Sequence, residues 1–221
     1  DWSSDVCSSD LERMRKLDAQ ADLSFGQLTI DRLPIRNAVL KTHGLDGQIT
    51  LDSLRGNISN GDFEVKGTLD VRPDLPVVTL QTRVNKVPVE SFYRSEDNAP
   101  VRGLLTSRSD MIGKGNSQKA LIDGLNGTAS FMLNNGVLVN ANLEQQVCLG
   151  ISKLNRKTLS GEPHGKDTPF QQLGGNLVIR NGVASNPDLK VQIPGLTVNG
   201  NGDIDLRVLG MDYRIGIIVE G

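Results

Sequence analysis

The stretch Gly56-Asn-Ile-Ser-Asn-Gly-Asp-Phe-Glu-Val65 decides the fold class. Apolar and polar residues alternate around an Asn-Gly pair, and such a pair suits a two-residue β-hairpin turn because both residues accept a positive φ. Similar patterns occur in residues 127–139 and 175–183, which carry Asn135-Gly136 and Asn181-Gly182. The sequence therefore predicts a series of antiparallel hairpins.

Alternation with a period of two extends from about Ser24 to Val219. Successive strand residues point to opposite faces, so this pattern predicts antiparallel strands with one apolar and one solvated face. The fold class we expect is mainly β with a few short helices. The apolar positions include Leu28/Ile30, Ile49/Leu51, Phe63/Val65, Leu69/Val71, Val78/Leu80, Leu177/Ile179, Leu189/Val191, Leu196/Val198, Ile204/Leu206 and Ile215/Ile217.

Composition indicates a shallow body rather than a thick core. Hydrophobic residues make up 37% and charged residues 23%, which is ordinary for a folded chain, but aromatic residues reach only 4% and there are 24 glycines. The nearly balanced charge gives no electrostatic reason to expect nucleic acid as a partner. No apolar run approaches the roughly 18 residues that a membrane span requires.

The first eleven residues, Asp1 to Leu11, resemble the translation of a sequencing adapter and are interpreted as an artefact. Without its three aspartates, the 26 acidic residues fall to 23, against 24 basic ones. Residues 12–221 form the expected β-rich region, and the whole chain reads as a fragment. Because no apolar pattern links the first segment to the body, its deletion is expected to leave stability unchanged.

Helical spacing of apolar residues predicts three helices, at Glu12–Ala21, Ser117–Leu125 and Asn142–Leu154. Ser117 is the expected N-cap of the second helix, and Asn126-Gly127 its left-handed stop. Two polar stretches, 94–100 and 160–169, are expected to be loops. The first of them marks a possible boundary within the β-rich region.

Residue types associated with catalysis or metal binding do not form a recognisable motif. His43 and His164 have no Cys or His neighbour at ligand spacing, and Asp203 and Asp205 alternate as solvated strand residues do. Cys148, on the third helix, is the only cysteine left once Cys7 is excluded, and we expect a sheltered structural thiol. The sequence therefore predicts a non-enzymatic protein with no cofactor, no metal and no catalytic residue.

Several motifs, in order and spacing, resemble the C-terminal region of the AsmA family, and their similarity favours an enterobacterial member. The resemblance covers about Leu23 to Gly221. It rests on Arg83-Val-Asn-Lys-Val-Pro-Val-Glu-Ser-Phe-Tyr93, Gly103, Gly113–Ser117, Ala120–Gly127, Phe131–Val137, Ala141–Leu143, Thr168–Phe170, Asn181–Val183, Leu196–Leu206 and Met211–Tyr213.

The resemblance implies a role in outer-membrane biogenesis in the cell envelope. It implies a periplasmic body on the inner membrane, anchored by an N-terminal helix that these residues lack. Larger relatives are grouped with bridge-like lipid transfer proteins, whose sheets curl into a trough with an apolar lining. We therefore expect repeated hairpins to form a curled, trough-like sheet that handles or conducts phospholipid between the inner and outer membranes.

The residues expected to contact lipid are apolar strand positions on one face: Phe63, Val65, Leu69, Val71, Phe131, Leu133, Leu177, Ile179, Ile204, Leu206, Ile215 and Ile217. The expected partners are phospholipid acyl chains, the inner membrane and, in one alternative, outer-membrane protein assembly components. In that alternative the chain is a periplasmic scaffold that regulates protein localisation to the outer membrane. One-sided alternation is also compatible with the inner face of an ordinary β-sandwich.

Overall fold

The structure is a computed structural model that describes residues 8–93, 98–141 and 166–219. Its strands are β1 (Ala19–Ile30), β2 (Leu33–Leu45), β3 (Gln48–Ile58), β4 (Gly61–Asp70), β5 (Val77–Pro88), β6 (Val101–Lys114), β7 (Asn126–Leu138), β8 (Thr168–Arg180), β9 (Val183–Ile193), β10 (Leu196–Asp205) and β11 (Gly210–Val219). The described helices are α1 (Ser8–Arg15), the 3-10 turn η1 (Val89–Phe92) and α2 (Gln118–Asp123).

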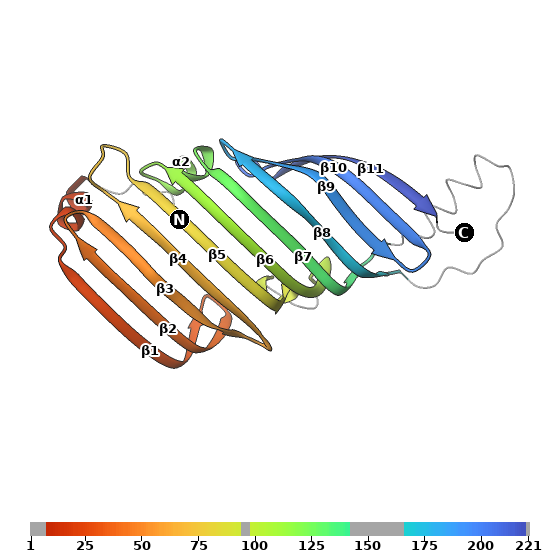
Figure 1. Ribbon diagram of the computed structural model, residues 1–221, viewed down its shortest axis with the longest axis horizontal. Coiled ribbons are helices and arrows are strands. Elements are labelled where there is room, and N and C mark those ends of the chain that lie inside the picture. The colour runs from red at the N-terminus through yellow and green to blue at the C-terminus, as the bar shows by residue number, and fades with distance from the viewer. Residues whose placement is uncertain (1–7, 94–97, 142–165, 220–221) are drawn as a thin grey trace, which may run out of the picture.

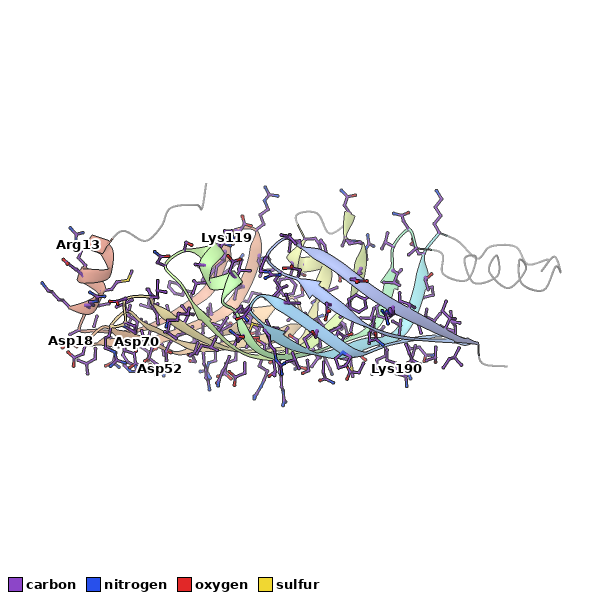
Figure 2. All side chains as sticks on the ribbon, turned by 90° about the horizontal axis from the view of Figure 1, so that it is seen from above. Arg13, Asp18, Asp52, Asp70, Lys119 and Lys190 are labelled. Atoms are coloured by element: carbon purple, nitrogen blue, oxygen red, sulfur yellow. The ribbon has the colours of Figure 1, made fainter. Side chains whose placement is uncertain are left out.

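The strands form one 11-stranded sheet in which spatial order follows chain order from β1 to β11. Each strand pairs antiparallel with the next, and in the described part of the chain β1 and β11 do not meet (Figure 1). The sheet is therefore open rather than a barrel, and it curves toward the side on which α1 and α2 lie (Figure 2). This architecture confirms the expected curled sheet of repeated antiparallel hairpins.

The alternation separates the two faces of the sheet as expected. On one face Leu40 pairs with Leu54, and Leu54 pairs with Val65. On the other face Asp52 and Lys190 lie on the side opposite α1 and α2 (Figure 2). The apolar face is thus the one toward which the sheet curves.

Two buried clusters lie at the end of the sheet that contains the turns at 31–32, 59–60 and 194–195. The first comprises Ile35, Ala38, Ile58 and Val87. The second comprises Leu133, Phe170, Val191, Ile193, Leu196 and Val198, with Phe131, Leu138 and Leu173 packed against it. Full burial of apolar side chains is therefore concentrated near one end of the strands.

One of the three expected Asn-Gly turns is confirmed. Asn181 and Gly182 connect β8 to β9 with φ values of 48° and 76°. In the first motif, Ser59 takes the positive φ and Gly61 already belongs to β4. The second prediction was wrong, because Asn135 and Gly136 lie inside β7, where the register with β6 shifts at a β-bulge.

The predicted helices need adjustment. Helix α1 begins at Ser8, within the segment interpreted as an artefact, and ends at Arg15, so residues 19–21 belong to β1 instead. Ser117 does cap α2, since its Oγ accepts a hydrogen bond from the backbone N–H of Ala120 at 3.2 Å. That helix ends at Asp123 with Gly124 as its C-cap, whereas Asn126 and Gly127 begin β7.

The remaining expectations concern connecting segments. The predicted helix at 142–154, which carries Cys148, lies outside the described residues. His164 lies outside them too. Thr168 and Pro169 were expected in a loop but start β8. Residues 94–97 are likewise outside the described part, while β5 and β6, on either side of them, pair directly in the same sheet.

The sheet contains an internal structural repeat that the sequence analysis did not detect. Adding 135 to the residue numbers of β2, β3 and β4 gives the bounds of β8, β9 and β10. The bulge between Leu51 and Leu54 recurs between Asn186 and Leu189. Two copies of the same three-strand arrangement therefore lie in one sheet.

Candidate functional site

The candidate site is the apolar face of the sheet. Its central part is made of half-buried side chains that the pairing register places side by side. Val65 pairs with both Leu54 and Thr82, while Leu80 pairs with Met111. Because these residues share neighbouring strands and one face, they form one floor that extends across the strands.

The layer that covers this face is incomplete in the described part of the chain. Leu17, which follows α1, lies 3.4 Å from where a Cβ on Gly44 would stand. At α2, Leu121 approaches Gly113 in the same way, with its carbonyl oxygen at 3.2 Å from such a Cβ. Both helices therefore lie over the same end of the apolar face, and floor residues such as Leu54 and Leu80 stay half-buried.

The twelve residues expected to contact lipid fall into four groups, three of which lie on strands. Half-buried on the apolar face are Phe63, Val65, Leu69, Phe131, Leu177 and Ile204. Leu133 and Ile179 lie on the same face but are buried by neighbouring side chains. Ile215 and Ile217 lie on edge strand β11 and are 62% and 49% exposed.

The other two residues lie outside the strands. Val71 follows β4 and is fully buried, with its backbone N–H donating to the carbonyl of Gly47 at 2.9 Å. Leu206 follows β10, and its N–H donates to the carbonyl of Gly182, also at 2.9 Å. Val71 and Leu206 therefore occupy equivalent turns of the repeat, outside the strands that carry the other ten residues.

Sequence reasoning missed several floor residues. Leu40, Leu54, Leu80 and Met111 lie on the apolar face but were not among the selected residues. Alternation alone shows that a residue such as Leu80 lies on the apolar side of its own strand. Their membership of the central floor follows only from the register of neighbouring strands.

Hydroxyl groups interrupt the apolar floor in its middle. Thr82 pairs with Ser109 across β5 and β6, and their side-chain oxygens are 2.6 Å apart. Ser107 occupies the next position on this face, opposite Val84 and Phe131. The first two hydroxyls satisfy each other, so this part of the face is less apolar without an unpaired polar group at that contact.

The second copy of the repeat carries a buried amide where the first has Leu51. Asn186 is 1% exposed, and its Nδ2 donates to the carbonyl of Asn176 at 2.6 Å. Asp188 accepts from the N–H of Asn176 at 2.7 Å, and this hydrogen bond lowers the pKa of the carboxyl group. The amide oxygen of Asn186 has no partner among the described residues.

Beside Asn186, Gly202 carries an aromatic neighbour from the edge strand. A Cβ on Gly202 would lie 2.7 Å from Cγ of Tyr213, so the ring occupies the space above this glycine. Burial, followed by the charge of Asp203, raises the pKa of Tyr213. The apolar face near β11 thus depends on glycines that leave room for larger side chains.

The opposite face carries exposed charges. Lys41 pairs with Asp22 at 3.3 Å, and Nδ1 of His43 lies 2.8 Å from Oδ2 of Asp52. His43 lies within β2. Asp205, one of the two alternating aspartates at the end of β10, pairs with Arg207 at 2.7 Å.

Within the described ranges, Asp, Glu, His and Cys side chains form no group of three or more that could hold a metal ion. No helix in that part of the chain is long and apolar enough to span a bilayer. The described geometry is therefore that of a one-sided apolar surface.

Comparison with known proteins gives the family. The AsmA family profile matches residues 5–189, which include β1 to β8 and part of β9. The chain belongs to the AsmA family. This result confirms the resemblance that the sequence motifs indicated.

The Protein AsmA of Escherichia coli (strain K12) is a distant relative, 22% identical to this AsmA-family chain over 177 residues. The alignment covers 79% of this chain and 28% of the E. coli protein, so the chain spans little more than a quarter of that relative. No solved structure matches. The narrower prediction of an enterobacterial member stays a prediction.

Proposed function

We propose that this chain is part of a non-enzymatic envelope protein whose apolar trough holds phospholipid acyl chains while their headgroups remain in water. The observation that carries the proposal is the half-buried, largely apolar floor formed by residues such as Leu54, Val65 and Leu80. An ordinary sandwich would cover this floor with a second sheet, whereas the described elements over it are short helices near one end.

The energetics favour retention without a specific pocket. Each acyl CH₂ removed from water contributes roughly 0.8 kcal/mol, so contacts along several strands are sufficient to hold a chain. Similar apolar contacts at successive strands also allow a lipid to move along the trough with small changes in free energy. The opposite face carries exposed charges, and this supports the proposal that it faces water.

Membership of the AsmA family supports an envelope role related to the outer membrane. In our proposal the chain lies on the periplasmic side of the inner membrane, to which a further N-terminal segment anchors it. Phospholipid is conducted toward the outer membrane, with no cofactor, metal or nucleic acid involved. The lipid is cargo and no covalent step occurs.

A paired substitution in β8 tests the trough. Leu177 lies on the apolar face, and the next residue, Val178, is 40% exposed on the opposite face. Leu177→Asp should lower co-purified phospholipid severalfold, because an unpaired carboxylate is expensive to desolvate. Val178→Asp makes the same chemical change and should leave the lipid content unchanged.

Native mass spectrometry of protein purified from cells, with quantified lipid extracts, measures this difference. Circular dichroism establishes that both variants are folded. Equal lipid content in the folded wild type and Leu177→Asp variant would refute the trough. We avoid Leu133 and Ile179 as test positions because both are buried, so an aspartate there would unfold the sheet as well.

The two edges of the sheet, which have no further strand beside them in the described part of the chain, favour a second candidate function, a periplasmic scaffold for outer-membrane proteins. Edge strands expose backbone groups to which another strand can add, and Phe25 on β1 and Ile215 on β11 are substantially exposed. In this alternative, purified protein is free of phospholipid and captures unfolded outer-membrane barrel segments. Lipid-loaded protein that fails to capture such segments would contradict the alternative.

A further inference from the structure

Two arginines face each other on the side of the sheet opposite the trough. Arg83 in β5 is directly paired with Arg108 in β6, and both side chains are exposed. Their sequence neighbours Thr82 and Ser109 belong to the apolar face, so the arginines point away from it. The Cβ atoms of such opposed residues lie about 5 Å apart, which allows both guanidinium groups to reach one small ligand.

Neither arginine forms an ion pair or a side-chain hydrogen bond within the described part of the chain. The nearest acidic side chains already have other partners. Glu64 pairs with Lys66 at 3.3 Å, and Asp110 accepts a hydrogen bond from Gln81 at 3.4 Å. Each guanidinium group therefore retains its full set of donors.

The pairing is unfavourable for the sheet itself. Like charges directly opposite each other on neighbouring strands are destabilising. In the same row, Glu64 lies opposite both Arg55 and Arg83, which is the favourable arrangement, whereas Arg108 lies opposite Arg83 and the neutral Ser130. The Arg83 and Arg108 pair would therefore be relieved by an anion that binds between the two side chains.

The surrounding surface forms a shallow depression of about 210 Å³. Its lining consists of Glu64, Lys66, Gln81, Thr82, Arg83, Arg108, Ser109 and Asp110. This volume is smaller than the roughly 300–1,000 Å³ of pockets for drug-sized ligands. The depression accordingly suits a small oxyanion group rather than a whole organic ligand.

We propose that Arg83 and Arg108 bind a phosphate group on the outer face of the sheet. Two planar guanidinium forks can each donate paired hydrogen bonds to phosphate oxygens, while the charge of Lys66 in the same depression is balanced by Glu64. The phosphate belongs either to a soluble compound or to a phospholipid headgroup. The site lies across the sheet from the acyl-chain floor, so it is independent of the proposed trough.

Titration of the full 221-residue chain with inorganic phosphate, at constant ionic strength with chloride as the replaced ion, tests the site. Binding is followed by the NMR signals of arginine Nε–Hε groups and by the melting temperature. We expect saturable shifts and a phosphate-dependent rise in melting temperature. Arg83→Gln or Arg108→Gln should weaken binding about tenfold or more, because each loses hydrogen bonds between charged groups.

Arg55→Gln is the matched control, since it removes the same charge from the same face, and it should retain phosphate binding. In chloride alone, Arg108→Gln should not lower the melting temperature, because it removes the repulsion with Arg83 and the other cross-strand neighbour of Arg108 is the neutral Ser130. A wild-type response no stronger than that of the Arg83→Gln, Arg108→Gln double variant would overturn the site. An equal loss in Arg55→Gln would overturn it too, by showing a general charge effect.

Vesicles distinguish the two sources of phosphate. If headgroups are the source, the wild type should co-sediment with phosphatidylglycerol vesicles and the double variant should not. If a soluble compound is the source, glycerol 3-phosphate should bind in the same arginine-dependent way while co-sedimentation is equal for both proteins. Absence of any arginine-dependent binding in both arms refutes the proposal.

Discussion

At the scale of single residues, glycines determine where large side chains fit on the curved face. A Cβ at Gly136 would lie 2.2 Å from Cζ of Phe170 and 2.4 Å from the carbonyl oxygen of Arg102. Phe170 is buried in the larger of the two apolar clusters. Because Gly136 has no side chain, the ring of Phe170 can pack against the β7 bulge.

Gly136→Ala should therefore destabilise the protein. The added methyl group must displace Phe170 or the backbone at Arg102, and such overpacking costs about 1–3 kcal/mol. Urea unfolding followed by circular dichroism measures the loss. Gly26→Ala on edge strand β1 is a suitable control, because a Cβ there meets no atom within 4 Å. Equal stability of the two variants would contradict this account of Gly136.

At the scale of elements, an Asp-x-Arg turn closes corresponding strands of the two repeats. Arg72 donates from Nη2 to Oδ2 of Asp70 at 2.6 Å, and Arg207 does the same to Asp205 at 2.7 Å. In both turns the arginine N–H also donates to the aspartate Oδ1, at 3.0 Å. The same local geometry therefore ends β4 and β10.

These contacts predict an acid-dependent loss of stability. Side-chain hydrogen bonds from the arginines lower the pKa of Asp70 and of Asp205 from 3.8 to about 2. A carboxyl group with a lowered folded-state pKa stabilises the fold above its unfolded-state pKa, and this contribution disappears as the pH falls through the folded-state value. The stabilisation should be present above pH 3.8 and lost toward pH 2.

The experiment compares melting temperatures of the wild type and of the Asp70→Asn, Asp205→Asn variant across this pH range. The wild type should be the more stable protein at neutral pH, and the difference should shrink as the pH falls toward 2. Both turns are exposed, so the expected effect is small. A difference that does not change with pH would show that the carboxylate charges contribute nothing.

At the scale of the whole molecule, the open sheet has strands of unequal stability. Central strands have hydrogen-bonded neighbours on both sides, whereas β1 and β11 have one neighbour each in the described structure (Figure 1). Apolar burial is also uneven, since β1 contributes no buried residue and most of β11 is exposed. The edges are therefore the regions where strands open most easily or add a partner.

Hydrogen exchange should reveal this gradient. We expect backbone amides of β6 and β7 to exchange at least about tenfold more slowly than those of β1 and β11, because opening a central strand breaks two ladders instead of one. Exchange measured by mass spectrometry on peptides from each strand provides the comparison. Equal protection of β11 and β7 would indicate that another strand or chain covers the β11 edge.

The sequence by itself determined the fold class and the apolar face. Period-two alternation depends only on the extended backbone, so pairs such as Phe63/Val65 and Leu177/Ile179 were placed on the correct side of their strands. The helix cap at Ser117 and the turn at Asn181-Gly182 were also predicted, because capping and positive φ are local properties. Motif order correctly indicated the AsmA family.

Only the tertiary structure decided which apolar residues form the floor and which are buried. Leu133 and Leu177 have the same alternation, yet Leu133 is buried by residues from other strands while Leu177 stays half-buried. The Asn135-Gly136 bulge and the pairing of Arg83 with Arg108 likewise depend on register. Register arises from contacts between residues far apart in the chain, and a local pattern carries no information about which strand lies beside it.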